Sequence, residues 1–188
     1  MHHEIHYRRV TEKDHSSMQG FAAVYQSAFA EAPYFESYDP NWIIDFVWKP
    51  HIPHCLIVAQ TEADGVVGIA CAHLITEDVS SVGAFLQSLS EEGAAMPFPL
   101  HKTVYMSELA VLAPFRGRGI GRSLVLRRHD WAKEVGLTHY CMRTAEQGSN
   151  SQHLYQTLGA RRAPFIQDMS DGEVKTESNQ RIFLYGLL

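Results

Sequence analysis

The segment Arg116-Gly117-Arg118-Gly119-Ile120-Gly121 constrains the fold most, because it joins a strand pattern to a helix pattern through alternate glycines. Residues 103–112 are a strong strand candidate, and residues 119–135 have helical periodicity that ends before Gly136. The first turn of a helix has unpaired N–H groups and partial positive charge, and glycines let phosphate oxygens approach the backbone. The segment therefore predicts an anion site at a strand–turn–helix junction, which belongs to an α/β fold.

Other phosphate-binding motifs fit this turn less well. A P-loop needs Gly-Lys followed by Ser or Thr, and that triplet is absent from the sequence. A dinucleotide fingerprint reads GxGxxG after a first strand, whereas this turn reads GxGxG in the second half of the chain. An RNA-binding Arg-Gly segment would be repeated, and this one occurs once. A tight turn with solvated arginines is the remaining alternative.

The rest of the chain predicts a mixed α/β domain that spans residues 1–188. An Asp64-Gly65 turn indicates a hairpin between two apolar strands. Residues 76–102 form a looser insert, in which residues 82–89 suit a short amphipathic helix. We expect the other helices over 15–30, 41–48, 119–135 and 150–158, and strands over 4–10, 55–60, 66–74, 103–112, 139–144, 160–167 and 181–187.

Composition narrows the class of protein. The net charge of −5 argues against general nucleic-acid binding, which favours basic faces. No apolar run approaches the roughly 20 residues of a membrane helix, and the polar start does not resemble a signal peptide, so a cytoplasmic protein is expected. Cys55, Cys71 and Cys141 form no CxxC pair, so neither a zinc site nor a disulfide framework is predicted, and no metal site is expected.

Two segments resemble motifs of the GNAT superfamily of acetyltransferases. Residues 107–121 resemble its core motif, whose signature Arg/Gln-x-x-Gly-x-Gly/Ala is matched by Arg116, Gly119 and Gly121. Residues 154–160 resemble its second motif, Leu-Tyr-x-x-Leu-Gly-Phe, and depart from it at Ala160. The resemblance implies a mixed, mostly antiparallel central sheet flanked by helices, with splayed fourth and fifth strands.

The resemblance also implies acetyl-CoA as cofactor, with coenzyme A as product. The strand edge at Leu109, Ala110 and Val111 would pair with pantetheine amides. Asn150 would contact the cofactor as well. The pyrophosphate would be held by the backbone of the turn, at Arg116, Gly117, Arg118, Gly119, Ile120 and Gly121.

Acetyl transfer to an amine needs a base for the amine and benefits from an acid for the thiolate. Glu108 is the base candidate: on a regular strand it would share one side with Val104, Met106, Ala110 and Leu112, and apolar neighbours would raise its pKa. Alternatively it is a structural ion-pair partner or faces solvent. His73 and His101 are weaker candidates, and Tyr105 or Ser107 could hold a water.

Tyr155 is the acid candidate, because in the resembling motif this tyrosine lies near the cofactor sulfur. Simple packing beside Leu154 and Leu158 is the alternative. We expect direct transfer to a primary amine of a small molecule. A protein N-terminal or lysine acetyltransferase and a non-catalytic acyl-CoA-binding module remain open.

Several features bear on the acceptor. The insert and the aromatic segment 34–48 suit a closed pocket better than a peptide groove. Four aromatic residues of that segment could line the pocket or pack a helix pair: Phe35, Tyr38, Trp42 and Trp48. No nucleic-acid or membrane partner is expected, and the resemblance allows a homodimer.

Overall fold

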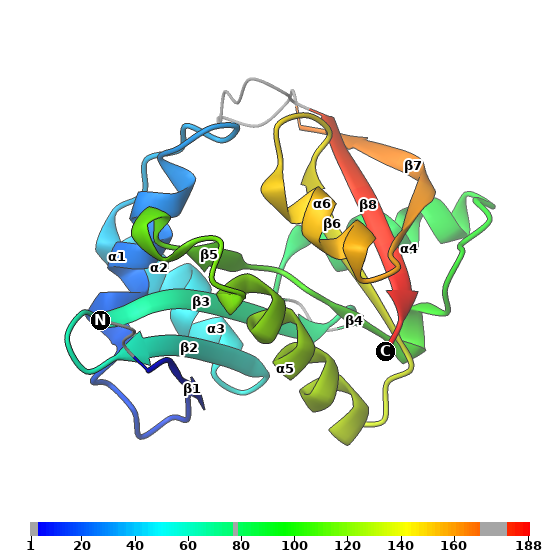
Figure 1. Cartoon of the computed structure of the whole chain (residues 1–188). Helices are drawn as coiled ribbons and strands as arrows, with labels where there is room; N and C mark the ends of the chain where they lie inside the picture. The colour runs from blue at the N-terminus through cyan, green and yellow to red at the C-terminus, as the bar shows by residue number, and fades with distance from the viewer. Residues whose placement is uncertain (1–3, 77–78, 170–179) are drawn as a thin grey trace.

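A computed structural model describes residues 4–76, 79–169 and 180–188, and its strands form one sheet (Figure 1). The strand order is β1-β2-β3-β4-β6-β8-β7, and β5 pairs with β3 beside that path. All pairs are antiparallel except β4 with β6. The strands are β1 His6–Arg9, β2 Cys55–Thr61, β3 Gly65–Leu74, β4 Thr103–Tyr105, β5 Leu109–Val111, β6 His139–Ala145, β7 Arg161–Asp168 and β8 Gln180–Leu187.

Helices cover both faces of the sheet. They are α1 Met18–Phe29, α2 Pro40–Ile43, the π-helix η1 Ile44–Trp48, α3 Lys49–His51, α4 Ser81–Glu91, α5 Ile120–Glu134 and α6 Asn150–Thr157, with 3₁₀ turns η2 Leu100–Lys102 and η3 Ala113–Phe115. The expected mixed α/β, mostly antiparallel fold is confirmed. Within the described ranges, no helix is long and apolar enough to cross a membrane.

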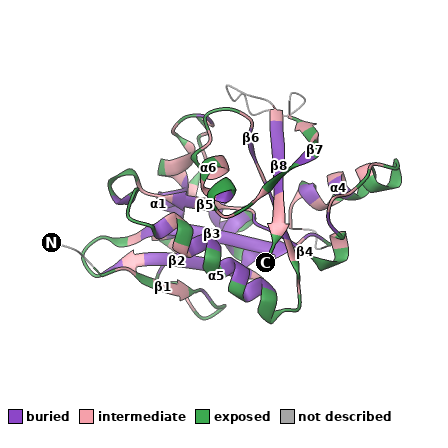
Figure 2. Cartoon of the chain, turned by 45° about the vertical axis from the view of Figure 1, so that its right-hand side comes forward, coloured by how far each residue is buried: buried purple, intermediate pink, exposed green. Residues whose placement is uncertain are grey.

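The central strands β2 and β3 are buried on both faces, which explains their nearly continuous apolar sequences (Figure 2). Ile57 of β2 packs in one cluster with Leu124 of α5, and its neighbour Val58 packs in the opposite cluster with Phe21 of α1. Successive side chains of a strand point to opposite faces, so one strand supplies both cores.

The insert covers a different part of the sheet. Val82 and Leu86 of α4 are fully buried and cluster with Phe98, Cys141 and Phe183, on the β6–β8 half. The expected short helix is present and is slightly longer than predicted. The insert is therefore a cover for the C-terminal half of the sheet.

The predicted strand 103–112 is interrupted by a β-bulge, so the expectation of one continuous strand is wrong. Ser107 N donates to Cys71 O at 3.1 Å, and Cys71 N donates to Glu108 O at 2.9 Å. Ser107 and Glu108 thus both oppose the single residue Cys71 of β3. This extra residue separates β4 from β5 and bends the strand. The side-chain alternation shifts with it: Met106 packs with the α5-side cluster, while Ala110 packs with the α1-side cluster.

The bulge also ends the pairing with β6. Before it, Tyr105 pairs with Cys141, and Met106 N donates to Cys141 O at 2.8 Å. After it, β5 pairs with β3 alone. The chain therefore diverges from β6. This is the expected splay, because the predicted fourth strand corresponds to β4 and β5 and the predicted fifth strand to β6.

One helix extends further than predicted. The helix expected over 41–48 continues to His51, past Pro50, because Pro50 lies in the first turn of α3, where proline is tolerated. The helix α6 begins at Asn150, as predicted, and Ser149 holds its cap position.

Candidate active site

Two adjoining cavities open where β5 diverges from β6. The larger, of about 700 Å³, is lined by the glycine turn, the β5 edge, the start of α6 and residues of the 28–34 segment. The smaller, of about 250 Å³, lies among the bulge, the loop after α1 and strand β6. The linings share Tyr34, Leu109 and Ser151, so the cavities meet at these residues.

The glycine turn presents an uncapped helix N-terminus to the larger cavity. Gly117 and Gly119 have left-handed φ angles of 73° and 80°, which glycine adopts without steric cost. Gly119 precedes α5 and has no side chain to cap it, and the first turn of α5 has no acidic residue. Its free N–H groups and dipole therefore suit the pyrophosphate of the predicted cofactor.

The arginines of the turn differ in position. Arg116 lines the larger cavity, donating from Nη1 to Glu31 Oε2 at 2.6 Å and from Nε to Val111 O at 2.9 Å. Arg122 also lines it. Arg118 does not: its Nη2 donates to Pro114 O at 2.9 Å, and its guanidinium lies over the Phe115 ring. Only the backbone of Arg118 is left for the predicted cofactor role.

The β5 edge faces the same cavity. Glu108 O and Leu112 N bond to β3, and antiparallel pairs alternate, so Ala110 completes the ladder with Ile69. Leu109 and Val111 then direct their N–H and C=O groups away from β3. Of the three residues predicted to pair with pantetheine amides, these two have backbone groups on the open side, and Val111 O is already bonded to Arg116.

Asn150 and Ile120 complete the predicted cofactor set. Both line the larger cavity, with Gly121 beside them. Asn150 is exposed at the start of α6, and the preceding Ser149 forms a 2.5 Å hydroxyl contact with Thr144. This contact links the cap residue of α6 to β6.

Glu108 lies on the bulge and lines the smaller cavity. The pKa of its carboxyl is raised from 4.5 to about 7, mainly by burial and also by the nearby Glu36. Arg143, Arg128 and a hydrogen bond with Tyr25 act in the opposite direction. The carboxyl is therefore poised to take up a proton near neutral pH.

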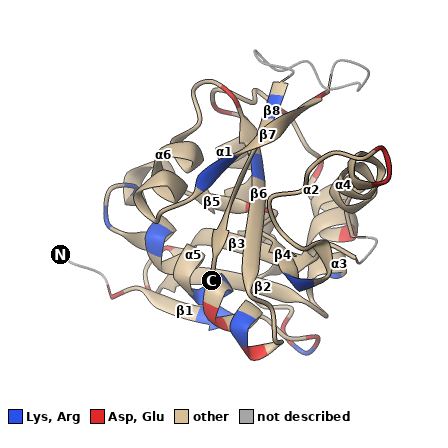
Figure 3. Ribbon diagram, turned by 90° about the vertical axis from the view of Figure 1, so that its right-hand side faces the viewer, with Lys and Arg blue, Asp and Glu red and all other residues tan. Residues whose placement is uncertain are grey.

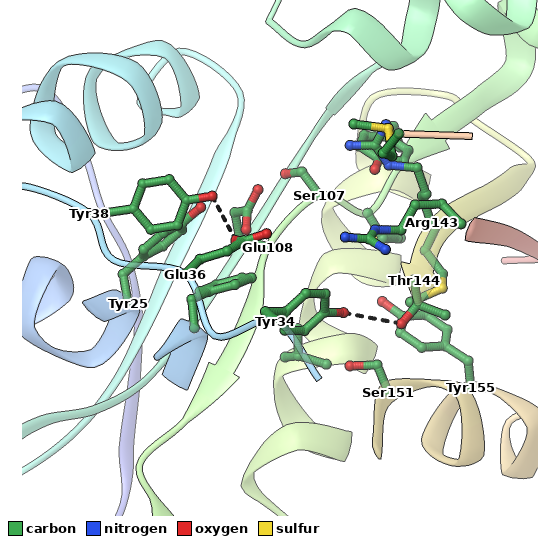
Figure 4. A pocket seen from close by; sticks show the side chains of 17 residues that line it. Tyr25, Tyr34, Glu36, Tyr38, Ser107, Glu108, Arg143, Thr144, Ser151 and Tyr155 are labelled. Carbon is green, nitrogen blue, oxygen red and sulfur yellow. Dashed lines mark hydrogen bonds between the residues drawn. The ribbon is translucent and has the colours of Figure 1, made fainter. Parts of the chain in front are cut away.

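A second carboxylate faces this cavity from the loop after α1. Burial raises the pKa of Glu36, although Tyr38 donates a hydrogen bond to its Oε2 at 2.6 Å (Figure 4). Tyr34, from the same loop, forms a 3.3 Å hydroxyl contact with Thr144 of β6. The loop thus reaches across the cavity to the opposite strand.

Tyr155 of α6 lines the smaller cavity and is 1% exposed. Its hydroxyl accepts a hydrogen bond from Arg128 Nη2 at 2.7 Å. Burial raises its pKa, and the charge and hydrogen bond of Arg128 oppose that rise. The hydroxyl proton is left to point elsewhere, because the Arg128 guanidinium can only donate.

Ser107 contributes a hydroxyl on the other side of the bulge. His51 Nδ1 donates to Val47 O at 2.7 Å, so its Nε2 accepts from the Ser107 hydroxyl at 2.9 Å. Burial lowers the pKa of His51 to about 4, which keeps the ring neutral. Ser107 and Tyr105 both line the smaller cavity, where they were expected as water-holding groups.

The weaker base candidates lie elsewhere. His73 is fully buried, with its pKa lowered by burial to about 4, and bonds to Leu74 O and Ser80. His101 is exposed on η2, beside a separate shallow pocket of the insert. Neither lines either cavity of the site. In the described residues, no group of three or more His, Cys, Asp or Glu side chains is arranged for a metal ion.

Several cavity residues could not be found from the sequence. Of the four aromatic candidates, Tyr38 lines the smaller cavity, whereas Phe35, Trp42 and Trp48 do not. No described residue of the insert lines either cavity, so the expectation that it closes the pocket is wrong.

Glu36, Arg143 and Arg181 come from three distant segments without a motif. Arg128 carried one signal, a charge on the apolar side of its helix.

Comparison with known proteins agrees with this geometry. The family model described as the acetyltransferase (GNAT) family matches residues 21–160. No curated protein matches the sequence in a direct search.

Solved structures share the fold at low sequence identity. The structure of yncA from Salmonella typhimurium, described with its cofactor acetyl-CoA, is 16% identical, with a TM-score of 0.68 over 98% of this chain and 94% of that one. An N-acetyltransferase from Staphylococcus aureus is 16% identical, with a TM-score of 0.68 over 98% of each chain. The ribosomal-protein-S18-alanine N-acetyltransferase from Escherichia coli is 10% identical, with a TM-score of 0.64 over 98% and 94%.

Proposed function

The chain belongs to the acetyltransferase (GNAT) family, and from that premise we propose that it transfers an acetyl group directly to a primary amine of a small molecule. Acetyl-CoA-dependent acetyl transfer is the chemistry of the family. The observation that carries the proposal is the junction of two cavities at Tyr34, Leu109 and Ser151. One cavity suits a phosphate-bearing cofactor, and the other presents a carboxyl with a pKa near 7.

Acetyl-CoA would lie in the larger cavity and supply the thioester. The backbone of Gly117, Gly119 and Gly121 would hold its pyrophosphate, with Arg122 adding positive charge beside the Arg116–Glu31 ion pair. The outward backbone groups of Leu109 and Val111 would pair with the pantetheine amides, as an added strand does. Asn150 lies on the facing wall and would contact the cofactor.

Glu108 would act as the general base. An alkyl amine is mostly protonated at neutral pH and must lose a proton before it attacks a carbonyl carbon. A carboxylate with a pKa of about 7 is matched to that step and is present in the amine's cavity. The ammonium proton passes to Glu108 directly or through water. The second nitrogen proton, lost as the new N–C bond forms and the C–S bond breaks, returns through water to the phenol oxygen that protonates the thiolate.

Tyr155 would act as the general acid. Its hydroxyl accepts from Arg128, which stabilises negative charge on the phenol oxygen as its proton leaves for the departing thiolate. Arg128 Nη1 also donates to Glu108 O at 3.0 Å and to Cys71 O at 2.9 Å. The base and acid candidates are thus positioned by one guanidinium.

The size of the smaller cavity favours a small molecule over a protein. The cavity has a volume of about 250 Å³. The loop after α1 lines one side of it and β6 lines the other. Tyr34 crosses between them to Thr144. Acetylation of a protein N-terminus is the second candidate, because a structure named for that activity shares the fold.

The test is release of free coenzyme A from acetyl-CoA in the presence of polyamines, aminoglycosides, amino acids and short peptides. We expect turnover with a small primary amine and none with peptides that lack lysine. Turnover confined to peptides would favour the second candidate, and the absence of turnover with every amine would contradict the proposal.

A further inference from the structure

The smaller cavity has positive charge on one wall that catalysis does not use. Arg143 of β6 opposes Phe183, and Arg181 of β8 opposes Ala145, so the two arginines are diagonal neighbours on one face of the sheet. Both line the cavity, and the ribbons of β6 and β8 each carry a basic segment (Figure 3). Side chains at such diagonal positions are close enough for one ligand to contact both.

Arg143 has a neutral hydrogen-bond partner. Its Nη1 donates to Gln167 Oε1 at 2.7 Å and lies 3.8 Å from the sulfur of Met169. Within residues 4–76, 79–169 and 180–188, no carboxylate lies within ion-pair distance of Arg143. Its charge is therefore held at the cavity without a counter-charge in contact.

The carboxylates lie on the facing wall. Figure 4 shows Glu36 and Glu108 on one side of the cavity and Arg143 on the other. Arg143 lowers the pKa of both carboxyls, because its positive charge attracts their negative charges across the cavity. Opposite charges that face each other without touching leave room for a ligand that carries both signs.

We propose that the acceptor is an amino-acid-like zwitterion, whose amine meets Glu108 and whose anionic group meets Arg143 with Arg181. The inference rests on the proposed function and names its substrate class. A guanidinium presents paired donors that match the oxygens of a carboxylate or of a phosphorus oxyacid.

The volume agrees with this class. A cavity of about 250 Å³ holds about eight water volumes, at roughly 30 Å³ each, which fits a free amino acid. A peptide N-terminus has an amide where a free amino acid has its carboxylate, so it would leave the Arg143 charge unpaired. The same residue therefore selects against peptides.

The experiment compares matched acceptors with wild-type protein. Each of the twenty proteinogenic amino acids is assayed beside its carboxamide and its methyl ester, and aminomethylphosphonate tests a phosphorus oxyacid. We expect the free acid of the preferred side chain to exceed its amide by about 10- to 100-fold in kcat/KM, the range for one charged hydrogen-bonded contact. Equal turnover of acids, amides and esters would overturn the proposal.

Variants locate the anion contact. Arg143→Gln should raise KM for the free acid and reduce the acid-to-amide preference to near one, while Arg143→Lys retains part of it. Arg162→Gln is the matched control, because Arg162 lies on the adjacent β7, bonds to Glu146 at 2.7 Å and does not line the cavity. An unchanged preference in Arg143→Gln would also overturn the proposal.

A binding measurement separates the zwitterion proposal from the proposed function. Calorimetric titration of the protein–coenzyme A complex with the same acids and amides reports acceptor affinity without turnover. Acetylation of amines that carry no anionic group, with no preference for the free acids, would contradict only the proposal that the acceptor is a zwitterion. Failure to release coenzyme A with any amine would contradict the proposed function itself. Preference for aminomethylphosphonate over every carboxylate would assign the site to phosphorus oxyacids.

Discussion

Arg128 donates a 2.7 Å hydrogen bond from Nη2 to the hydroxyl of Tyr155. The same guanidinium bonds to the backbone of Glu108, so it links the two residues proposed to move protons. Arg128 is fully buried, and within the described residues its Nε has no partner. A buried charge with neutral partners costs stability. Here the buried guanidinium orders Glu108 and Tyr155 through its hydrogen bonds.

Arg128 and Tyr155 should be energetically coupled in catalysis. Tyr155→Phe removes the proposed acid, and Arg128→Met removes the donor that favours loss of its proton. Each change should lower kcat, and the double variant should lose less than the sum, with a coupling of about 0.5–3 kcal/mol. Single-turnover rates of the four proteins measure this, and strictly additive losses would argue against a shared role.

Glu108→Gln should lower kcat by about 10²- to 10⁴-fold, the usual contribution of a general base. Acetyl-CoA affinity, measured by calorimetry, should stay near the wild-type value. In the wild type, kcat/KM should rise with pH through an apparent pKa of about 7, because the ionised form of Glu108 is the base. Glu91→Gln on the exposed end of α4 is the control, and a Glu108→Gln enzyme with the wild-type pH profile would exclude this assignment.

The same substitution should stabilise the fold at high pH. Because burial raises the pKa of Glu108 from 4.5 to about 7, ionisation in the folded state costs free energy. That cost is absent below pH 4.5, grows as the pH rises to about 7 and is constant above it. Glu108→Gln should therefore raise the free energy of unfolding by about 1–3 kcal/mol at pH 8 and leave it unchanged near pH 4.5. Denaturant titrations at both pH values test the sign.

Gly119 and Gly136 offer a matched pair at the two ends of α5. Both have φ angles near 80°, and a Cβ built on either meets no atom within 4 Å. Valine at either position should cost about 1–3 kcal/mol of stability through backbone strain. Only Gly119→Val should also weaken acetyl-CoA binding, by about tenfold or more in Kd, because only Gly119 lines the larger cavity. Equal Kd values for the two variants would refute the pyrophosphate site.

Leu86→Ala in α4 should affect stability and not the site. Leu86 is fully buried between the insert and the sheet, so its truncation should cost about 2–5 kcal/mol. The KM values for acetyl-CoA and the acceptor should not change, since the insert lines neither cavity. A selective rise in acceptor KM would show that the insert shapes the pocket after all.

The fold was largely predictable because its signals are local. Alternation predicted the strands, and the glycine turn predicted the start of α5. The bulge was not predictable: residues 103–112 alternate plausibly throughout, and the extra residue is visible only when Cys71 is paired with both Ser107 and Glu108. The raised pKa of Glu108 was nevertheless predicted, although the bulge, and not a regular strand, positions this residue.

The smaller cavity, which we propose as the acceptor pocket, was the least predictable part of the site. Glu36, Arg143 and Arg181 meet through the packing of a loop against β6 and β8, and no spacing in the sequence links them. Motifs report contacts within one segment, whereas this pocket is assembled from several. Arg118 shows the converse: it lies within the motif, yet its side chain points away from the cavity.

The β-bulge has a kinetic consequence. The gap between β5 and β6 is set by the number of residues in the chain, so no strand has to peel away before acetyl-CoA enters. Entry into such a preformed gap should follow a single diffusional step, without a slow opening phase. Deleting one residue from 106–108 would bring β5 back into step with β4, extend the pairing with β6 and seal the entrance.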